Sequence, residues 1–303
     1  MKVVIIGGTG FIGSALVSAM LERGDKVTLV TRAPVAAQQR WDARIDARLW
    51  NGRDPGPWVM ALSGTDAVIN LSGESVAGGR WTPERKLALI KSRIDSTRAV
   101  VKALAAADVR PPVLVNASAV GFYGANPTGD CAEDAPQGSD FLAALCGQWE
   151  REAREAEKLE VRAVMARLGV VLGTGGGALA KMLTPFRLGL GGPLGSGRQP
   201  FPWVHIDDAV GAILYAIDDV TIDGPMNVTA PDSKTNAEFT KELGRALHRP
   251  AFLPAPAFAL RLALGEMSTL LLDGQRAIPK ILLARGYKFK RPTIEDALAS
   301  LLK

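Results

Sequence analysis

The sequence has few of the residues from which metal sites and disulfide networks are built. Its 303 residues include only two cysteines, Cys131 and Cys146, and only two histidines, His205 and His248. Two cysteines cannot form a zinc knuckle or a disulfide framework, and two histidines disfavour a histidine-rich metal site. The sequence therefore predicts no metal centre, and it fits a reducing compartment, for which we expect the cytoplasm.

Long apolar runs are also missing. A membrane-spanning helix needs about 18 or more consecutive apolar residues, and no such run is present. The apolar stretch 3–6 follows Lys2, but glycines at 7, 8, 10 and 13 interrupt what comes next, and no small-residue cleavage site follows. We therefore expect no export, no membrane span and no membrane partner.

Basic residues are spread along the chain and do not form a block. The net charge is +5, from 36 Lys and Arg against 31 Asp and Glu, without the basic run typical of a nucleic-acid tail. We expect a small-molecule ligand of anionic character, no nucleic-acid partner, and a monomer or homodimer. With 47% hydrophobic and 22% charged residues, the composition is that of a globular protein.

Short apolar runs alternate with segments of helical period, the pattern of an α/β fold with a doubly wound parallel sheet, as in Rossmann domains. Helices are expected at 83–106, 141–158, 207–216 and 236–248. The expected strands are 2–6, 26–30, 47–49, 67–71, 113–117 and 162–167.

The alternation ends near residue 172. We expect a Rossmann domain over 1–172, to which part of 200–230 returns, and a smaller substrate-side lobe over 173–303. A proline-rich hinge at 250–256 would open a terminal domain at about 250–303 within that lobe.

The stretch from Val3 to Gly13 has the form of a strand, a glycine turn and a helix start, in that order. Gly7 permits a tight turn, Gly10 lets the backbone approach a pyrophosphate, and Gly13 lets helix pack on strand. The helix N-terminus offers free N–H groups to phosphate. This order predicts a dinucleotide site at Gly7, Gly10 and Gly13 together with Thr9, Phe11 and Ile12.

The end of the second strand favours NADP(H) over NAD. An acid about 20 residues past the turn would bind the ribose 2′-OH of NAD. Thr31 and Arg32 stand there instead, and the planar guanidinium of Arg32 suits a 2′-phosphate. A solvated surface arginine is the alternative.

These motifs resemble the extended short-chain dehydrogenase/reductase superfamily, in its NAD-dependent epimerase/dehydratase branch. Within it the chain resembles an atypical group of bacterial and mitochondrial epimerase-like proteins without an assigned substrate. The resemblance rests on Asn70-Leu71-Ser72-Gly73-Glu74, the stretch 186–193 and Gly195-Ser196-Gly197-Arg198-Gln199. The segment around 274–280 resembles the small C-terminal domain that accompanies this group.

The resemblance implies further cofactor contacts. Leu71, Ser72 and Gly73 follow the fourth strand and would line the cofactor ribose, although a plain turn is the alternative. Arg93 matches a helical position that faces the cofactor in the group, with a solvated helical arginine as the alternative. We also assign Arg167 and Val171, beside the end of the sixth strand, to the cofactor site.

Catalysis in the superfamily uses a Ser or Thr after the fifth strand and a Tyr-x-x-x-Lys pair on the next helix. Ser118 and Tyr123 match the first region, with a spacing one residue longer than usual. The pair is missing, because Leu142 and Cys146 occupy its positions and no tyrosine has lysine four residues on. The usual acid/base mechanism therefore does not carry over.

Three side chains near the expected sheet edge are left as candidate acids or bases: Ser118, Tyr123 and Glu74, the last as a partly buried carboxylate. Loop capping or packing is the alternative for each. We interpret His205 as structural.

The glycines of 189–198 predict a mobile cover over the pocket, in which Arg198 contacts an anionic substrate, with a solvated arginine as the alternative. Two functions remain open. One is an NADP(H)-dependent epimerase/dehydratase-like oxidoreductase acting on a small anionic substrate such as a nucleotide sugar. The other is a non-catalytic, NADP(H)-binding regulatory protein.

Overall fold

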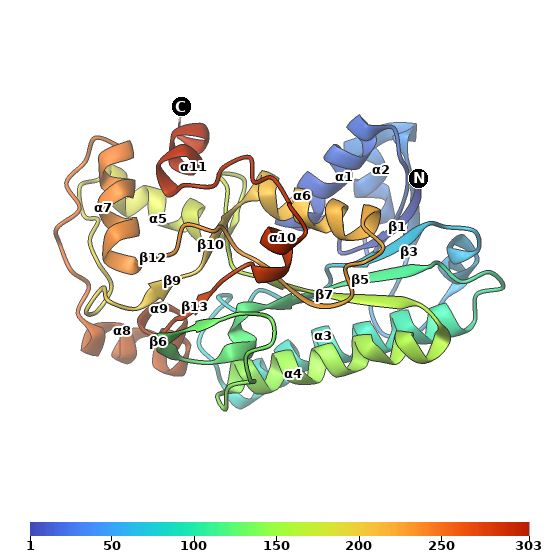
Figure 1. Cartoon of the computed structure of the whole chain (residues 1–303), viewed down its shortest axis with the longest axis horizontal. Helices are drawn as coiled ribbons and strands as arrows, with labels where there is room; N and C mark the ends of the chain where they lie inside the picture. Colours follow the sequence, from blue (N-terminus) through green and yellow to red (C-terminus); the bar gives the residue numbers. More distant parts are fainter. Residues whose placement is uncertain (303) are drawn as a thin grey trace.

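A parallel sheet of seven strands forms the centre of the molecule, in the order β11-β7-β5-β4-β1-β2-β3 (Figure 1). The computed structural model describes residues 1–302, apart from the side chains of residues 127 and 128, so residue 303 of the expected lobe lies outside the described residues. The strands are β1 (Lys2–Ile6), β2 (Lys26–Thr31), β3 (Ile45–Leu49), β4 (Ala67–Asn70), β5 (Val113–Ala119), β7 (Arg162–Leu168) and β11 (Gly224–Val228).

Six of these strands are the expected ones, and their bounds differ from the expected bounds by at most two residues. The seventh, β11, was not expected as a strand. Its sequence Gly-Pro-Met-Asn-Val has no apolar run, and it becomes a strand by pairing in parallel with β7 at the edge of the sheet. Tertiary pairing here overrides a weak local preference.

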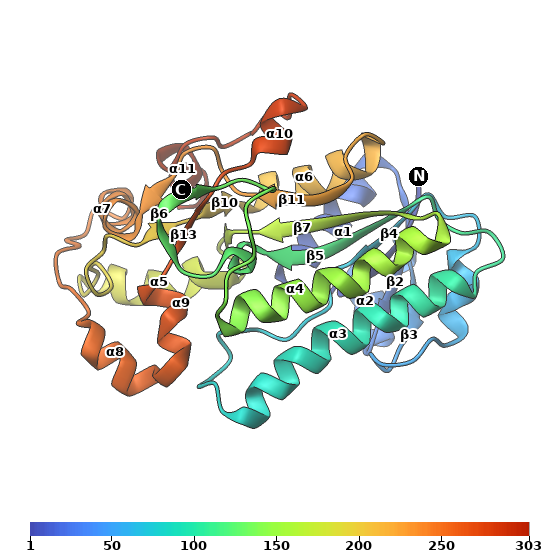
Figure 2. The same ribbon diagram turned by 60° about the horizontal axis from the view of Figure 1, so that its bottom comes forward.

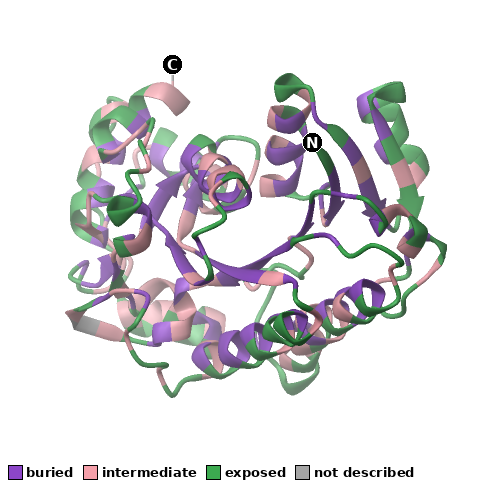
Figure 3. Cartoon of the chain, turned by 45° about the vertical axis from the view of Figure 1, so that its right-hand side comes forward, coloured by how far each residue is buried: buried purple, intermediate pink, exposed green. Residues whose placement is uncertain are grey.

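Helices cover both faces of the sheet, as the doubly wound pattern predicts (Figure 2). The helices on one face are α1 (Phe11–Arg23), α2 (Pro34–Trp41) and α6 (Ile206–Asp218), and those on the other are α3 (Pro83–Ala105) and α4 (Phe141–Arg154). The expected helix 141–158 ends earlier, because its last turn is the 3₁₀ helix η4 (Glu155–Leu159). The central strands are buried on both faces (Figure 3).

The rest of the chain builds a smaller lobe at one end of the sheet (Figure 1). Its core includes Leu179, Trp203, Phe239 and Leu298. Its helices are α5 (Gly177–Arg187), α7 (Asn236–Ala246), α8 (Ala257–Leu264), α9 (Thr269–Leu272) and α11 (Ile294–Leu301). Helix α10 (Lys280–Ala284) instead packs on the central sheet, where Leu282 joins its core. Three short strand pairs connect the lobe: β8 (Val170–Leu172) with β10 (Trp203–His205), β9 (Pro200–Phe201) with β12 (Lys234–Thr235), and β6 (Asn126–Cys131) with β13 (Gln275–Ala277).

The strand order reverses direction between β1 and β4. From β1 the chain proceeds outward through β2 and β3, and from β4 it proceeds outward through β5 and β7 on the other side. Ligands of open parallel sheets bind at the carboxyl ends of the strands at such a switch point. The glycine turn after β1 and the residues after β4 meet at this edge.

Candidate functional site

The turn after β1 has the geometry that its glycines predict. Gly7 has a φ of +80°, and a Cβ on it would lie 2.7 Å from the carbonyl carbon of Leu71. A Cβ on Gly13 would lie 2.4 Å from the Gly7 oxygen, so this glycine allows the helix to pack on the turn. At Gly10 the nearest protein atom would be 3.4 Å away. The space in front of Gly10 is therefore open toward a ligand.

Helix α1 starts without a side-chain cap. Its N-cap is Gly10, its first turn has no acidic residue, and Thr9 and Gly10 are exposed. The first N–H groups of a helix have no partner within the helix, so those of α1 remain available to an anion. The turn and the helix start thus fit a dinucleotide pyrophosphate. Phe11 packs on the lobe, where a Cβ on Gly173 would come within 2.7 Å of its ring.

The end of β2 is free of acids. Thr31 is buried and its Oγ accepts a hydrogen bond from the Ala33 N–H at 3.2 Å. Arg32 is exposed, and no ion pair or hydrogen bond joins its side chain to another described residue. A second guanidinium lies nearby on α2: Arg40 donates to Ser14 Oγ of α1 at 2.9 Å. Arg40 was not predicted as a site residue, because no motif in the sequence marks it.

The residues after β4 pack against α3. The Leu71 N–H donates to the Ile6 oxygen at 2.8 Å, which joins this segment to the end of β1. Ser72 Oγ donates to Ser96 Oγ at 2.9 Å. Gly73 lies against Arg93, whose guanidinium carbon would be 3.3 Å from a Cβ at this position. Leu71, Ser72 and Gly73 therefore form one wall of the switch point.

Arg93 brings a half-buried positive charge to this wall. It donates to the backbone oxygen of Glu74 at 2.9 Å and to the backbone oxygen of Leu89 at 3.2 Å. Its guanidinium lies 5.1 Å from the ring centre of Trp149. Burial lowers the pKa of Arg93 from its ordinary value, although it remains charged at neutral pH.

Ser118 and Tyr123 do not lie open at the sheet edge but in a buried network. Ser118 Oγ donates to Glu150 Oε1 at 2.7 Å, and Tyr123 donates to Asn227 Oδ1 at 2.7 Å. Both side chains are less than 5% exposed. Burial raises the pKa of Tyr123 to about 12, so its hydroxyl stays protonated. These partners make both residues structural in this arrangement.

Arg167, which the sequence assigned to the cofactor site, is the centre of that network. Its Nε and Nη2 donate to the two oxygens of Glu150, both at 2.8 Å, and its Nη1 donates to Tyr123 at 2.9 Å. The side chain is 3% exposed. Its guanidinium is therefore occupied by protein partners. Val171, in β8, is buried, and its role in the cofactor site stays a prediction.

The expectation that Glu74 is partly buried is wrong. Its side chain is 45% exposed and forms an ion pair with Arg85 of α3. Its partner Arg85 is partly buried, with a side chain 24% exposed. Glu74 therefore has a charged partner in place of the burial that was expected.

Leu142 and Cys146 occupy the sequence positions of the missing tyrosine and lysine. They face the turn after β5, since a Cβ on Gly121 would be 3.4 Å from Leu142 Cβ and 3.9 Å from Cys146 Sγ. Burial raises the pKa of the Cys146 thiol to about 12, so it is not a thiolate at neutral pH. Neither Leu142 nor Cys146 therefore supplies an acid or base at this position at neutral pH.

His205 has the structural role that the sequence suggests. Its Nδ1 accepts the Asp207 N–H at 3.1 Å and so caps α6, and its Nε2 lies 3.0 Å from Ser300 Oγ of α11. Burial lowers the pKa of His205, which favours the neutral ring.

The glycine-rich stretch 189–198 is not built as a loose cover. Its backbone is hydrogen bonded to the segment before α8, with Leu253 N to Gly191 O at 3.2 Å and Ala255 N to Pro193 O at 2.9 Å. A Cβ on Gly192 would lie 1.7 Å from the Leu253 oxygen. Glycine here allows close packing of two backbones, which corrects its interpretation as a source of mobility. Arg198 is exposed, and its contact with substrate stays a prediction.

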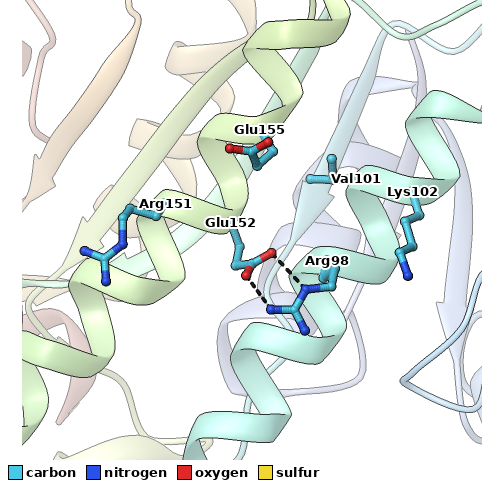
Figure 4. Close-up of a pocket in the computed structure, with 6 residues that line it drawn as sticks. All are labelled: Arg98, Val101, Lys102, Arg151, Glu152 and Glu155. Atoms are coloured by element: carbon cyan, nitrogen blue, oxygen red, sulfur yellow. Dashed lines mark hydrogen bonds and ion pairs between the residues drawn. The ribbon is translucent and has the colours of Figure 1, made fainter.

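A groove between α3 and α4 is also present, but it does not belong to this edge (Figure 4). It has a volume of about 350 Å³ and is crossed by the Arg98–Glu152 ion pair. Both helices run opposite to the strands, so their C-terminal halves lie toward the amino ends of the sheet. We assign no site to this groove.

Among the described residues, no group of three or more His, Cys, Asp or Glu side chains could hold a metal ion. Within residues 1–302, no helix is long and apolar enough to cross a membrane.

Comparison with known proteins identifies the family. Residues 3–229 match the model of the NAD dependent epimerase/dehydratase family. The chain belongs to this family. Residues 255–301 match a domain of unknown function, DUF1731, so the terminal segment of this epimerase-family chain is also a recognised unit.

Relatives that match the whole chain occur in distant organisms. The epimerase family protein SDR39U1 of Mus musculus is 40% identical over 306 residues, covering 100% of both chains. The epimerase family protein YfhF of Bacillus subtilis is 38% identical, covering 100% of this chain and 98% of its own. A chloroplastic homolog from Arabidopsis thaliana is 40% identical, covering 100% of this chain and 87% of its own length.

A solved structure bears on the cofactor. The crystal structure of human SDR39U1 with NADPH has a TM-score of 0.89 and 38% identity, covering 100% of this chain and 99% of that one. A UDP-galactose 4-epimerase structure, at 18% identity and a TM-score of 0.74, shares the fold alone. The expected Rossmann fold and the family are thus confirmed, and the NADPH in the human SDR39U1 structure agrees with the expected cofactor.

The buried carboxylate of Glu133 makes the stability of the folded protein depend on pH. Its Oε1 accepts the N–H groups of Asn227 and Ile281, both at 3.1 Å, while Oε2 has no partner among the described residues. Burial raises the pKa of Glu133. The folded protein therefore holds the proton of Glu133 more tightly than the unfolded chain does. Stability falls as the pH rises above the pKa of Glu133 in the unfolded chain, and the fall ends once the pKa in the folded protein is passed.

Replacing Glu133 with glutamine should remove that loss. We expect Glu133→Gln to lose less stability than the wild type as the pH rises from acid to neutral, and to recover about 1 kcal/mol at neutral pH, because the amide stays neutral. Urea unfolding of both proteins across this range measures it, with exposed Glu157→Gln as the control. Parallel pH curves for wild type and Glu133→Gln would contradict the prediction.

Proposed function

We propose that this protein is an NADP(H)-dependent oxidoreductase of the epimerase/dehydratase type that acts on a small anionic substrate, such as a nucleotide sugar, without a tyrosine–lysine pair. One observation carries the proposal: an uncapped helix start and two guanidinium groups, of Arg32 and Arg93, border the switch-point edge. Such an edge suits a phosphorylated cofactor and an anionic substrate together.

The chain's own residues would bind and orient. When bound, NADP(H) supplies or accepts a hydride at its nicotinamide ring. The turn at Gly7–Gly13 would hold the pyrophosphate, Arg32 the 2′-phosphate, and residues 71–73 the ribose. Leu142 and Cys146 transfer no proton. A proton that the reaction needs would come from solvent or from the substrate.

Turnover is the test of this proposal. The purified protein is mixed with NADPH or NADP+ and a panel of carbonyl compounds and nucleotide sugars. The absorbance of the reduced nicotinamide reports net reduction, and NMR of the substrates reports epimerisation or dehydration, which regenerate the cofactor. We expect conversion of at least one anionic substrate, retained in Ser118→Ala and Tyr123→Phe, because both hydroxyls are hydrogen bonded to buried partners. Gly10→Val is the inactive control. Tight NADPH binding without turnover on the whole panel would contradict the proposal.

The second candidate is a regulatory protein that binds NADP(H) without catalysis. It is favoured by the inward hydrogen bonds of Ser118 and Tyr123, which leave no acid or base aimed at the switch point. In that case NADPH would bind, protect the turn from proteolysis and remain unconsumed.

Arg32 is expected to decide the cofactor. Arg32→Asp removes a partner of the 2′-phosphate and introduces an acceptor for the ribose 2′-OH, so the preference should change from NADPH to NADH. Loss of one charge-assisted bond of about 1.5–3 kcal/mol weakens NADPH about 10- to 100-fold. Calorimetric titration of both cofactors measures this, with Arg151→Asp on the exposed side of α4 as a matched charge control. If NADPH still binds Arg32→Asp far better than NADH, the assignment of Arg32 is wrong.

A further inference from the structure

Helix α8 is apolar but unburied. Seven of the eight residues of Ala257–Leu264 are apolar, and none of the eight is buried. Phe258 and Leu262, one helical turn apart, are 74% and 78% exposed. A helix that is apolar all round is normally enclosed by its own protein or by a membrane. The outer side of α8 therefore lacks its partner.

Neighbouring segments extend this apolar surface. The linker before α8 exposes Phe252 and Leu253, and the loop after α5 exposes Leu188 and Leu190. The two segments are joined by the Leu253–Gly191 backbone bond and by Arg249 Nε donating to the Arg187 oxygen at 3.0 Å. Figures 1 and 2 both show the α7–α8 linker at the end of the molecule farthest from the N-terminal strands.

We name this surface the α8 face. It comprises the exposed apolar residues Leu188, Leu190, Phe252, Leu253, Phe258 and Leu262 and the exposed arginines Arg187, Arg245, Arg249 and Arg261.

The α8 face has an excess of positive charge. Residues 173–206 contain no Asp or Glu, and neither do residues 243–265, although Glu242 and Glu266 flank the second segment. Arg245 forms an ion pair with Glu242 at 3.6 Å, whereas Arg187, Arg249 and Arg261 form no ion pair with a described residue. Exposed phenylalanine and leucine beside unpaired arginines form the combination that enters the headgroup region of anionic membranes.

We infer that the α8 face docks on an anionic lipid surface. The apolar side chains would enter the boundary between headgroups and acyl chains, and the arginines would pair with lipid phosphates. A symmetric contact with a second copy fits less well, because the same patch on both subunits would set arginines against arginines. The expectation of no membrane partner rested on the lack of a spanning helix, which has no bearing on binding at the surface.

Vesicle sedimentation tests the inference with the full chain. We expect binding to vesicles of phosphatidylcholine with phosphatidylglycerol, little binding to phosphatidylcholine alone, and weakening by salt. The double variant Phe258→Ser, Leu262→Ser should bind at least tenfold more weakly. So should Arg249→Gln combined with Arg261→Gln. Neither pair is buried, so the variants should fold and keep the NADPH affinity of the wild type.

Met60→Ser is the matched control, since Met60 is 84% exposed but lies outside the α8 face. Its vesicle binding should equal that of the wild type. The inference is overturned if the wild type ignores anionic vesicles or if the Phe258 and Leu262 substitutions leave vesicle binding unchanged. It is also overturned if sedimentation velocity finds a dimer that these substitutions dissociate, since the face would then be a contact between copies.

Discussion

Replacing Gly10 with valine is expected to abolish NADPH binding while leaving the protein folded. The backbone at Gly10 is extended, with φ −74° and ψ 179°, a conformation that any residue adopts. The nearest protein atom to an added Cβ is the Gly7 oxygen at 3.4 Å, an ordinary contact. The valine would instead project into the space where the pyrophosphate meets the first N–H groups of α1.

The expected loss is on the order of 100-fold or more, because two or more charge-assisted hydrogen bonds of about 1.5–3 kcal/mol each would be lost. Calorimetry measures the affinity and thermal unfolding measures the fold. Gly56→Val is the control, since Gly56 is also extended, at φ −135°, and lies away from the turn. Unchanged NADPH affinity in Gly10→Val would remove this turn from the cofactor site.

The features that sequence predicted well are set by local constraints. A glycine with φ +80° at Gly7, and one at Gly13 against which a Cβ would collide, leave a readable spacing after a buried strand. The absence of an acid at the end of β2 can also be read from the sequence, and the role of Arg32 there stays a prediction. Each of these inferences needs only a strand, a turn and a helix in sequence.

The features that sequence missed depend on contacts between distant segments. Glu150 lies on an amphipathic helix and looks like a surface residue, yet it is buried against Arg167, 17 residues further on. Arg167 in turn holds Tyr123, from 44 residues earlier in the chain. No local pattern distinguishes this network from a ligand site at the same strand end.

Glycine is ambiguous for the same reason. At 189–198 a run of glycines fits a mobile loop and two closely packed backbones equally well, and only the position of Leu253 decides between them. Strand β11 was missed because its pairing with β7, rather than its own sequence, makes it a strand.

The second large effect is expected on stability, from the removal of Glu150. Burial lowers the pKa of Arg167, but the hydrogen bonds and the charge of Glu150 outweigh it, so the pKa lies above its ordinary value. Without Glu150, the guanidinium of Arg167, which is 3% exposed, keeps only the Tyr123 hydroxyl and the backbone oxygen of Glu133 as hydrogen-bond partners. Leaving one charge of a buried pair uncompensated costs about 3–5 kcal/mol.

We therefore expect Glu150→Ala to lower the free energy of unfolding by about 3–5 kcal/mol in urea denaturation. The matched control is Glu152→Ala, two residues along the same helix. Glu152 also pairs with an arginine, but the side chains of that pair are 24% and 47% exposed, so its loss should cost about 0–1 kcal/mol. Glu150→Gln, which keeps an acceptor for Ser118 but no charge, should fall between the two and serves if Glu150→Ala does not fold. Equal losses for Glu150→Ala and Glu152→Ala would mean that Arg167 finds another counter-charge or water. The ion pair of Glu150 with Arg167 would then not be a large source of stability at the end of β7.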